Sequence, residues 1–283
     1  MPRKLIKSPF NYTGNKFKLL PQIMPLMPDN ITHFVDLFCG GCAVGMNVTS
    51  ENVTFNDKVA TIPGLLQYFL HAESGEKVLQ DVDACIEHYN ITVDNIDGYE
   101  KLRTAYNARC FEMPVALLTL ILHAFNSIIR YNSQGDYNAP FGYKNSWLNP
   151  SRRKVLATFV DELVARQVML ANTTFSAVEL PDAKGAYIYC DPPYIITQAV
   201  YNADWTMTDE YALYRYLDDL NDRGYLWGLS NVTHHNGKVN IVLNDWLQRY
   251  HVHEIEADYN KSLATKSDTA KKWTSREVFI TNY

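Results

Sequence analysis

The stretch that decides the fold reads Phe34-Val-Asp-Leu-Phe-Cys-Gly-Gly-Cys-Ala-Val-Gly45. An apolar run ends in an aspartate, two glycines and a Cys-x-x-Cys pair. If residues 33–38 form the first strand of an α/β sheet, the glycines lie at its carboxyl end, where doubly wound folds bind their cofactors. Glycine permits a sharp turn and a close approach of a ligand to the main chain. We therefore expect Gly40 and Gly41 to shape a cofactor crevice.

An acidic residue follows the next predicted strand. Asp57 comes directly after residues 53–56, where a carboxylate can accept hydrogen bonds from both hydroxyls of a ribose. The glycine spacing is not the G-x-G-x-x-G of dinucleotide enzymes. Together the two features indicate a cofactor that contains a nucleoside and places no demand on phosphate binding.

The pair Cys39 and Cys42 leaves two other interpretations open. A thioredoxin-like dithiol begins a helix after a strand, and Cys39 nearly does so. A structural zinc site needs four ligands, but no second Cys-x-x-Cys or suitably spaced histidine pair follows. We favour the interpretation that two small thiols pack beside the glycine loop, and we expect no metal.

Length and composition describe an ordinary globular protein. The chain has 283 residues, of which 47% are hydrophobic and 20% charged, and its net charge is -5, so a nucleic-acid surface would have to be a local basic patch. The start Met-Pro-Arg-Lys carries no signal-peptide core and the cysteines are widely spread, which favours a cytoplasmic location. The most apolar stretch, residues 115–129, is too short for a membrane span and predicts a buried helix.

Strand-like runs alternate with helical patterns along the chain. This alternation is typical of a doubly wound, mostly parallel sheet, here of about seven strands. The predicted strands cover residues 33–38, 53–56, 167–171, 186–190, 225–230, 251–256 and 277–282. Helices are predicted over residues 151–166 and 209–221, and Gly224 is expected to stop the second.

Between about residues 60 and 143 the pattern changes to successive helical stretches. We interpret this segment as an inserted helical domain. Its end, Arg130 to Gly142, is polar and aromatic with a glycine-centred turn, which predicts a hairpin. The predicted domains are residues 1–59, the insert 60–144, and residues 145–283.

A second motif, Asp191-Pro-Pro-Tyr194, follows the predicted buried strand 186–190. The prolines lack N–H donors, so the turn presents carbonyl oxygens beside a carboxylate. That arrangement suits a hydrogen-bond donor such as an amino group on an aromatic ring, and Tyr194 offers a flat face for stacking. An isolated Asp-Pro more often only caps a surface turn, but its position after a buried strand favours the functional interpretation.

These motifs, in this order, resemble the DNA adenine methyltransferase (Dam) family of amino-group methyltransferases that use S-adenosylmethionine, and its phage-encoded branch in particular. The resemblance spans nearly the whole chain. Its segments are Tyr12 to Lys16, Phe34 to Gly41, Asn56-Asp57, Phe125 to Arg130, Ala139 to Gly142, Cys190 to Thr197, Tyr201-Asn202 and Trp227 to Asn231. It implies a Rossmann-like methyltransferase fold in which the insert recognises DNA.

The resemblance also implies a reaction. The methyl of S-adenosylmethionine passes, without a metal, to the 6-amino group of an adenine flipped out of duplex DNA, in GATC or a related site. The implied catalytic residues are Asp191, Pro192 and Tyr194. The implied cofactor contacts are Tyr12, Lys16, Asp36, Phe38, Gly40, Asp57, Phe175 and Asp191.

The implied DNA contacts are Asn11, Ser127, Arg130, Asn132, Pro140, Phe141, Gly142 and Tyr201. Arg130 is the candidate for a bidentate contact to guanine. Candidate phosphate contacts are Arg152, Arg153, Lys154, Lys261, Lys266, Lys271 and Lys272. Bacterial relatives tend to carry lysine where this chain has Asn11, so we expect the first base pair to be read differently.

Several alternatives remain open from the sequence. The same chemistry could act on a cytosine, an RNA or a protein glutamine, or the chain could be a DNA-binding regulator that has the fold without turnover. Intact Asp57, Asp191 and Tyr194 favour catalysis, and a helical insert with a polar hairpin favours duplex DNA. We expect a monomer or a weak dimer on DNA, located in the cytoplasm, or in the host cytoplasm if the chain is phage-encoded, with no membrane partner.

Overall fold

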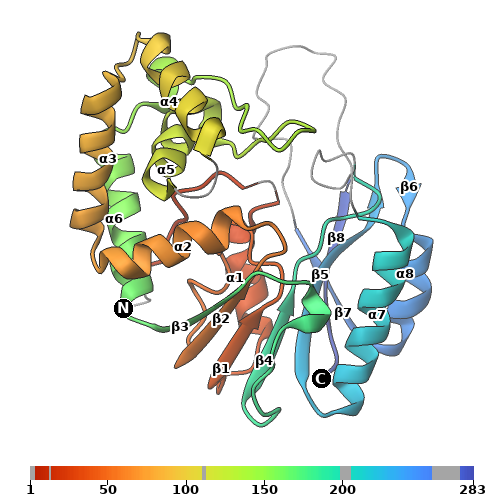
Figure 1. The fold of residues 1–283 in the computed structure, drawn as a ribbon. Coiled ribbons are helices and arrows are strands. Elements are labelled where there is room, and N and C mark those ends of the chain that lie inside the picture. The colour runs from red at the N-terminus through yellow and green to blue at the C-terminus, as the bar shows by residue number, and fades with distance from the viewer. Residues whose placement is uncertain (1–3, 13, 110–112, 198–204, 257–274) are drawn as a thin grey trace. The chain divides into compact units, whose positions relative to one another are not determined.

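The computed structural model describes residues 4–12, 14–109, 113–197, 205–256 and 275–283 (Figure 1). Contacts between Cα atoms divide the chain into two compact units. The first, which we call the helical unit, comprises residues 1–15, 40–47 and 59–172. The second, which we call the sheet unit, comprises residues 16–39, 48–58 and 173–283.

The sheet unit contains a mainly parallel sheet, as the sequence predicts. Strands β2 (Asn52–Asn56), β1 (His33–Asp36), β4 (Ala186–Cys190) and β5 (Leu226–His235) lie in this order and are parallel. Strand β8 (Ser275–Thr281) pairs antiparallel with β5. Because β7 (His251–Ile255) pairs antiparallel with β8, it runs in the same direction as the first four strands. The short β6 (Lys238–Val239) forms a hairpin with β5.

Side chains of the central strands alternate between two buried faces. On one face Val35, Ile188 and Trp227 belong to a core that also contains residues of helices α7 (Met207–Asp222) and α8 (Ile241–Trp246). Figure 1 shows these two helices beside the sheet. On the other face Phe34 stacks on Tyr187 and Tyr189, with ring centroids 5.9 and 6.0 Å apart. Burial on both faces explains why β4 is an uninterrupted apolar run instead of an alternating one.

Short helical elements complete the sheet unit. They are η1 (Lys16–Lys18), α1 (Leu20–Ile23), η2 (Met24–Leu26), η6 (Phe175–Ala177) and η8 (Leu247–Arg249). Helix α7 begins with a capping box, in which Thr206 and Asp209 each accept the other's backbone N–H. It ends before Gly224, whose φ of +80° confirms the predicted stop signal.

The helical unit consists of helices that follow one another along the chain. They are α2 (Thr61–Ala72), α3 (Gly75–Tyr89), α4 (Ile96–Arg109), α5 (Pro114–His123), η4 (Phe125–Ser127), η5 (Tyr143–Ser146) and α6 (Pro150–Val164). Strand β3 (Gln167–Ala171) follows α6. The rings of Phe10, Phe69 and Phe159 pack together with centroids 6.2 to 6.3 Å apart, so the N-terminal segment belongs to this core. The three-part division into domains predicted from the sequence stays a prediction.

The prediction of one buried helix over residues 115–129 is wrong in its second half. Helix α5 is buried from Ala116 onward but ends at His123. Asn126 and Ser127 have φ of +54° and +51°, which an α-helix cannot accommodate. The N–H of Phe125 donates instead to the carbonyl of Pro140 at 2.8 Å. The chain leaves the helix here because it pairs with the far end of the hairpin.

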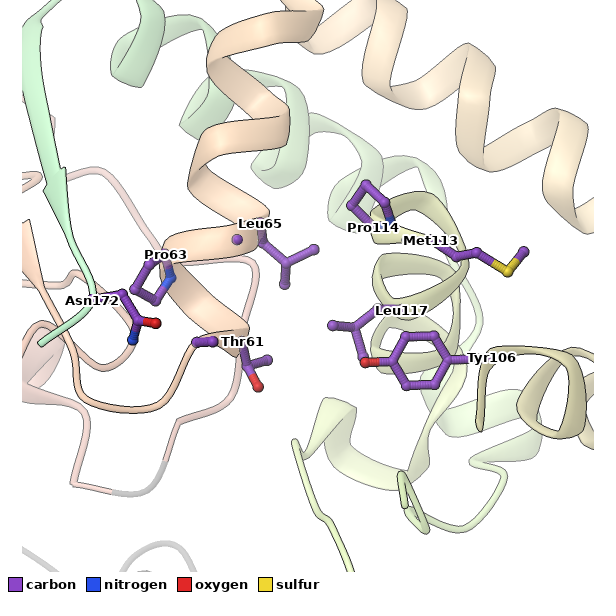
Figure 2. A pocket seen from close by; sticks show the side chains of 10 residues that line it. Thr61, Pro63, Leu65, Tyr106, Met113, Pro114, Leu117 and Asn172 are labelled. Atoms are coloured by element: carbon purple, nitrogen blue, oxygen red, sulfur yellow. The ribbon is translucent and has the colours of Figure 1, made fainter. Parts of the chain in front are cut away.

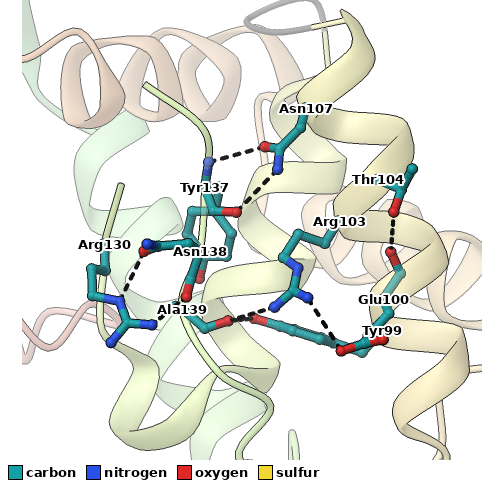
Figure 3. A network of polar contacts seen from close by, with 9 residues as sticks. All are labelled: Tyr99, Glu100, Arg103, Thr104, Asn107, Arg130, Tyr137, Asn138 and Ala139. Atoms are coloured by element: carbon teal, nitrogen blue, oxygen red, sulfur yellow. Dashed lines mark hydrogen bonds and ion pairs between the residues drawn. The ribbon is translucent and has the colours of Figure 1, made fainter. Parts of the chain in front are cut away.

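The hairpin predicted over residues 130–142 is confirmed. Tyr131 and Tyr137 form an antiparallel bridge, and Gly135 in the turn has φ of +86°. Helix α4 supports the returning arm (Figure 3). The Asn107 side chain exchanges two hydrogen bonds with the backbone of Tyr137, at 3.0 and 3.1 Å. The Tyr99 hydroxyl donates to the carbonyl of Ala139 at 3.0 Å.

Hydrophobic length gives no indication of a membrane segment. Within the described ranges, no helix combines the length and the apolar character that crossing a bilayer requires.

Candidate active site

Three aspartates mark the carboxyl ends of neighbouring parallel strands in the sheet unit. Asp36 is the last residue of β1, Asp57 follows β2, and Asp191 follows β4. Asp36 is 1% exposed and Asp57 is 9% exposed. In open α/β sheets this edge is where ligands bind. The sheet unit therefore gathers acidic side chains where the sequence predicts the cofactor.

The Asp191 carboxylate is held by two side chains. Nζ of Lys16 lies 2.7 Å from Oδ2, and the hydroxyl of Tyr194 donates to Oδ1 at 3.0 Å. Lys16 is buried although it carries a charge and lies in the short helix η1. Burial raises the pKa of Asp191 above its usual range, and the Lys16 ammonium opposes that rise. The motif after β4 thus forms a fixed, charged hydrogen-bonding centre.

A second carboxylate completes this centre. Glu277 of β8 is 2% exposed, and its Oε1 accepts a hydrogen bond from the Tyr194 hydroxyl at 3.2 Å. The same Oε1 lies 3.7 Å from Nζ of Lys16. Nζ of Lys16 also lies 5.0 Å from the centroid of the Tyr194 ring. We call Lys16, Asp191, Tyr194 and Glu277 the carboxylate cluster.

Aromatic rings lie in the same unit. The ring of Phe38 lies 5.7 Å from that of Phe175, and the ring of Trp205 meets it edge-on at 5.7 Å. Trp205 is anchored because its indole N–H donates to the carboxylate of Glu210 at 2.7 Å. Glu210 is fully buried and also accepts from the Asn240 amide at 3.0 Å and from the Tyr214 hydroxyl. These rings, only partly buried, offer apolar faces to a planar ligand.

The sheet unit therefore fits a nucleoside cofactor on its own residues. Asp57 is of the type that accepts hydrogen bonds from ribose hydroxyls. Phe38 and Phe175 can contact an adenine ring, and the net negative charge of the carboxylate cluster suits a sulfonium. Within the described part of the chain, no three His, Cys, Asp or Glu side chains are grouped as metal ligands would be.

The glycine loop shows which group approaches its backbone. Gly40 has φ of +43°, and a Cβ built on it would lie 2.9 Å from Cδ1 of Tyr12. A Cβ on Gly41 would lie 3.2 Å from Cβ of Tyr12. Glycine at both positions therefore leaves room for the Tyr12 ring, and the expectation that these glycines shape a cofactor crevice stays a prediction.

The thiols of Cys39 and Cys42 are buried. Sγ of Cys42 is fully buried and lies 3.7 Å from the carbonyl oxygen of Gly40. The backbone N–H of Cys39 donates to the carbonyl of Asn56 at 2.8 Å. Burial of both side chains supports the interpretation that they pack beside the loop.

The candidate DNA-reading residues other than Tyr201 lie in the helical unit. The exposed Arg130 donates from Nε to Oδ1 of Asn138 at 2.8 Å, and a second guanidinium N–H reaches the Asn138 carbonyl (Figure 3). One edge of the guanidinium is therefore fixed by the opposite arm of the hairpin. Asn11 belongs to the same unit and donates to the Asn126 carbonyl at 2.9 Å.

The other candidates around the hairpin are partly structural. Oδ1 of Asn132 accepts the N–H groups of Gln134 and Asp136 and shapes the turn. Phe141 is 6% exposed and packs against Tyr99, with ring centroids 5.1 Å apart.

The remaining residues of this corner differ in exposure. Pro140 is exposed, and the N–H of Gly142 donates to the His123 carbonyl at 2.9 Å. Ser127 is buried and accepts from the Arg152 guanidinium.

The candidate phosphate contacts also differ in whether they are paired or exposed. Arg153 forms a bidentate pair with Asp83, at 2.5 and 2.7 Å, whereas Lys154 is exposed. Tyr201, Lys261, Lys266, Lys271 and Lys272 lie outside the described residues.

Comparison with known proteins identifies the family. Residues 12–260 match the D12 class N6 adenine-specific DNA methyltransferase family. The chain belongs to this family. It is 36% identical over 285 residues to the Type II methyltransferase M.FokI of Planomicrobium okeanokoites, covering 98% of this chain and 43% of that protein. It is also 36% identical over 290 residues to the modification methylase StsI of Streptococcus sanguinis, covering 99% and 43%.

A shorter relative is the DNA adenine methylase of Haemophilus influenzae, 29% identical over 219 residues, or 74% of this chain and 72% of that protein. The chain spans about two-fifths of the length of the first two relatives. The family confirms the resemblance seen in the sequence and the Rossmann-like fold class.

Three residues near the predicted site were not identified from the sequence. Glu277 lies beyond the residues that match the adenine methyltransferase family, and Trp205 and Glu210 belong to no motif. One signal was available for Glu277, since it is the single acidic residue that begins the apolar run Val278 to Ile280. A charged residue at the edge of a buried strand is rare unless it is paired.

The helical unit contains a pocket of about 320 Å³ (Figure 2). It is lined by residues of α2, α4 and α5 and by Asn172 after β3. None of the predicted site residues that the structure describes contributes to its wall.

Proposed function

We propose that this chain transfers the methyl group of S-adenosylmethionine to the 6-amino group of adenine in duplex DNA. The observation that carries the proposal is the Asp191 carboxylate, held at the end of β4 by Lys16 and Tyr194 in a chain of the adenine methyltransferase family. An acceptor fixed in this way can receive the hydrogens of an aromatic amino group.

The proposed mechanism is positional and electrostatic. The lone pair of the amino nitrogen is delocalised into the adenine ring, so the nitrogen is a weak nucleophile. When the Asp191 carboxylate and the Pro192 carbonyl accept its two hydrogens, the nitrogen is favoured in a tetrahedral form with its lone pair directed at the methyl group. As the nitrogen–carbon bond forms, the sulfur–carbon bond breaks, and the excess proton leaves the nitrogen toward Asp191.

The target base must leave the duplex to reach this centre. Flipping an adenine out of the stack costs a few kcal/mol, which stacking on an aromatic ring partly offsets. Tyr194 is the proposed stacking partner, because its hydroxyl is tied to Asp191 and Glu277 and its ring is thereby held in place.

S-adenosylmethionine, when bound, supplies the electrophilic methyl. We propose that Asp57 binds its ribose, that Phe38 and Phe175 contact its adenine, and that Asp36 lines the same site. The resemblance adds Tyr12, Lys16 and Gly40. Trp205 joins this set because its ring lies against Phe38 and is anchored by Glu210.

Arg130 is the proposed reader of a guanine in the major groove. Asn138 occupies the Nε edge of its guanidinium, and the outer edge can still form a bidentate contact. The recognition site is GATC or another adenine-containing sequence. Relatives named as a Type II methyltransferase and a modification methylase support a site-specific modification role.

The test is a methylation assay with mapped products. The full chain and the variant Asp191→Ala are incubated with labelled S-adenosylmethionine and, separately, with duplex DNA, RNA and protein. The products are then sequenced with adenine-methylation detection. We expect label only in duplex DNA, on adenine at one sequence, and none with Asp191→Ala. Label in RNA, cytosine or protein, or full activity of Asp191→Ala, contradicts the proposal.

A further inference from the structure

Glu277 is a buried carboxylate in the catalytic centre to which the mechanism above gives no part. Its side chain is 1% exposed, and it comes from β8, on the far side of β5 from the Asp191 strand. A carboxylate is almost never buried so completely unless it has a partner. The cost of burying Glu277 beside Asp191 therefore calls for an explanation.

Two partners of Glu277 are also partners of Asp191. The Tyr194 hydroxyl lies 3.0 Å from Oδ1 of Asp191 and 3.2 Å from Oε1 of Glu277. The Lys16 ammonium lies 2.7 Å from Asp191 and 3.7 Å from Glu277. A phenol has one hydrogen to donate, so the two carboxylates compete for it.

This competition matters when the substrate arrives. An amino group that donates to Asp191 takes lone pairs that Tyr194 and Lys16 use in the absence of substrate. A buried donor that loses its acceptor is costly. Glu277 removes that cost, because the hydroxyl and the ammonium already face it and need only a small shift.

We propose that Glu277 is a positioning residue of the methyl-transfer centre, which retains Tyr194 and Lys16 in place while Asp191 accepts the amino group of the substrate. The inference rests on the proposed function of Asp191. It extends that function to a strand outside the residues that match the family.

The charge of Glu277 has a second consequence. Among the described residues, the groups that act on Asp191 include Lys16 of η1, Tyr194 of the motif and Glu277 of β8. Lys16 and Tyr194 lower the pKa of Asp191, whereas Glu277 raises it, in addition to the rise caused by burial. Asp36 of β1, which like Asp191 and Glu277 raises the pKa of Tyr189, and Asp57 after β2 are further carboxylates at this edge. Removing the charge of Glu277 should therefore make Asp191 easier to ionise.

The experiment compares Glu277→Gln and Glu277→Ala with the control Glu254→Gln. Glu254 lies on the neighbouring strand β7 and is 65% exposed, paired with Arg276 at the surface, so its substitution makes the same charge change outside the cluster. Single-turnover rates, KM for DNA and for S-adenosylmethionine, thermal unfolding and the pH dependence of the rate are measured for the full chain.

We expect kcat to fall by about 10- to 100-fold in Glu277→Ala, the scale on which misplaced groups affect catalysis, with unchanged KM values. Glu277→Gln should recover part of this loss, because the amide oxygen still accepts from Tyr194. In Glu277→Gln the acid side of the pH–rate profile should shift to lower pH, because Asp191 ionises more easily. Glu254→Gln should match the wild type in both rate and pH profile.

Each other outcome overturns the inference. The inference is rejected if Glu277→Gln has the wild-type rate and the wild-type acid limb of the pH–rate profile. It is also rejected if that acid limb is unshifted and the rate falls only in proportion to a loss of thermal stability. If Glu277→Ala does not fold, the pH profile of Glu277→Gln decides. An active Asp191→Ala instead rejects the proposed function itself, whereas an inactive Asp191→Ala beside normal Glu277 variants rejects this inference alone.

Discussion

Lys16 and Asp191 form a buried ion pair, with Nζ of the lysine 2.7 Å from Oδ2 of the aspartate. The Lys16 side chain is 4% exposed and that of Asp191 is 18% exposed, so solvent screens the pair only weakly. The pair joins a helical turn near the start of the chain to the end of β4. Its strength should therefore set the pH at which the centre works.

Lys16→Met should move the acid limb of the rate to higher pH. Lys16 lowers the pKa of Asp191, so its loss raises that pKa, and the ionised carboxylate disappears earlier as the pH falls. Breaking a buried pair should also lower the free energy of unfolding by about 3–5 kcal/mol. The measurement is the pH dependence of single-turnover rates, with Lys18→Met as control, since Lys18 is exposed in the same turn. A limb that stays in place would show that Asp191 does not set it.

Arg130→Ala should relax recognition at one base pair. A bidentate contact to guanine contributes about 1–3 kcal/mol of discrimination, so methylation of the site substituted at that pair should rise toward that of the true site. Asn138→Ala should give a smaller change at the same pair, because Arg130 loses the Oδ1 acceptor but keeps its charge and its hydrogen bond to the backbone carbonyl of residue 138.

The measurement for Arg130 is the rate on a set of singly substituted duplexes. The control is Arg223→Ala, which removes an exposed arginine directly after the C-terminus of α7. A uniform loss on all duplexes would assign Arg130 to the phosphate backbone instead.

Strands β1, β4 and β8 were predictable because each contains a buried apolar run with a clear end. The predicted strand over residues 186–190 coincides with β4, and Gly224 ends α7 as expected. The end of α5 was not predictable, because the apolar pattern continues through Ile129 and only pairing with the hairpin draws the chain out of the helix.

The site was predictable where a motif places its residues next to each other. Asp191 and Tyr194 share one turn, so their contact follows from the sequence. Glu277 lies near Asp191 because of the order of the strands in the sheet, and Trp205 is held by the buried carboxylate of Glu210. The hydrophobic periodicity of the sequence predicts neither contact. Long-range pairing between polar groups is the part that a single sequence does not reveal.

Gly40→Ala should destabilise the protein by about 1–3 kcal/mol, the usual cost of a side chain in left-handed backbone. Its φ is +43°, and the new Cβ would press on the Tyr12 ring from 2.9 Å. Gly64→Ala is the matched control, since a Cβ there meets nothing within 4 Å inside helix α2 and should stabilise by about 0.4–1 kcal/mol. Chemical denaturation measures both. If Gly40→Ala instead stabilised the protein and Gly64→Ala destabilised it, Tyr12 would not pack on the loop.

His123 should make stability depend on pH. Burial lowers the pKa of His123 from 6.5 to about 4, and its Nδ1 lies 2.8 Å from the Thr119 carbonyl. The folded state favours the neutral ring. The stability that His123 contributes is therefore complete above pH 6.5 and is lost as the pH falls toward 4. The free energy of unfolding should be about 1.4 kcal/mol lower at pH 5.5 than at pH 7.5 from this residue alone.

The check on His123 is denaturation at both pH values. His123→Asn should remove this part of the slope, whereas His251→Asn, an exposed position in β7, should leave it unchanged. If the two variants have the same slope as the wild type, the buried ring does not control acid stability.

The double variant Cys39→Ala, Cys42→Ala should still methylate DNA. Both thiols are buried, and the Cys42 sulfur lies 3.7 Å from the carbonyl oxygen of Gly40. Loss of their volume should cost about 1 kcal/mol per site in unfolding free energy and leave kcat unchanged with or without a reducing agent. The measurement is the single-turnover rate in reduced, oxidised and chelator-treated samples. A wild-type rate that responds to oxidation or to chelation, together with an inactive double variant, would return these cysteines to the chemistry of the site.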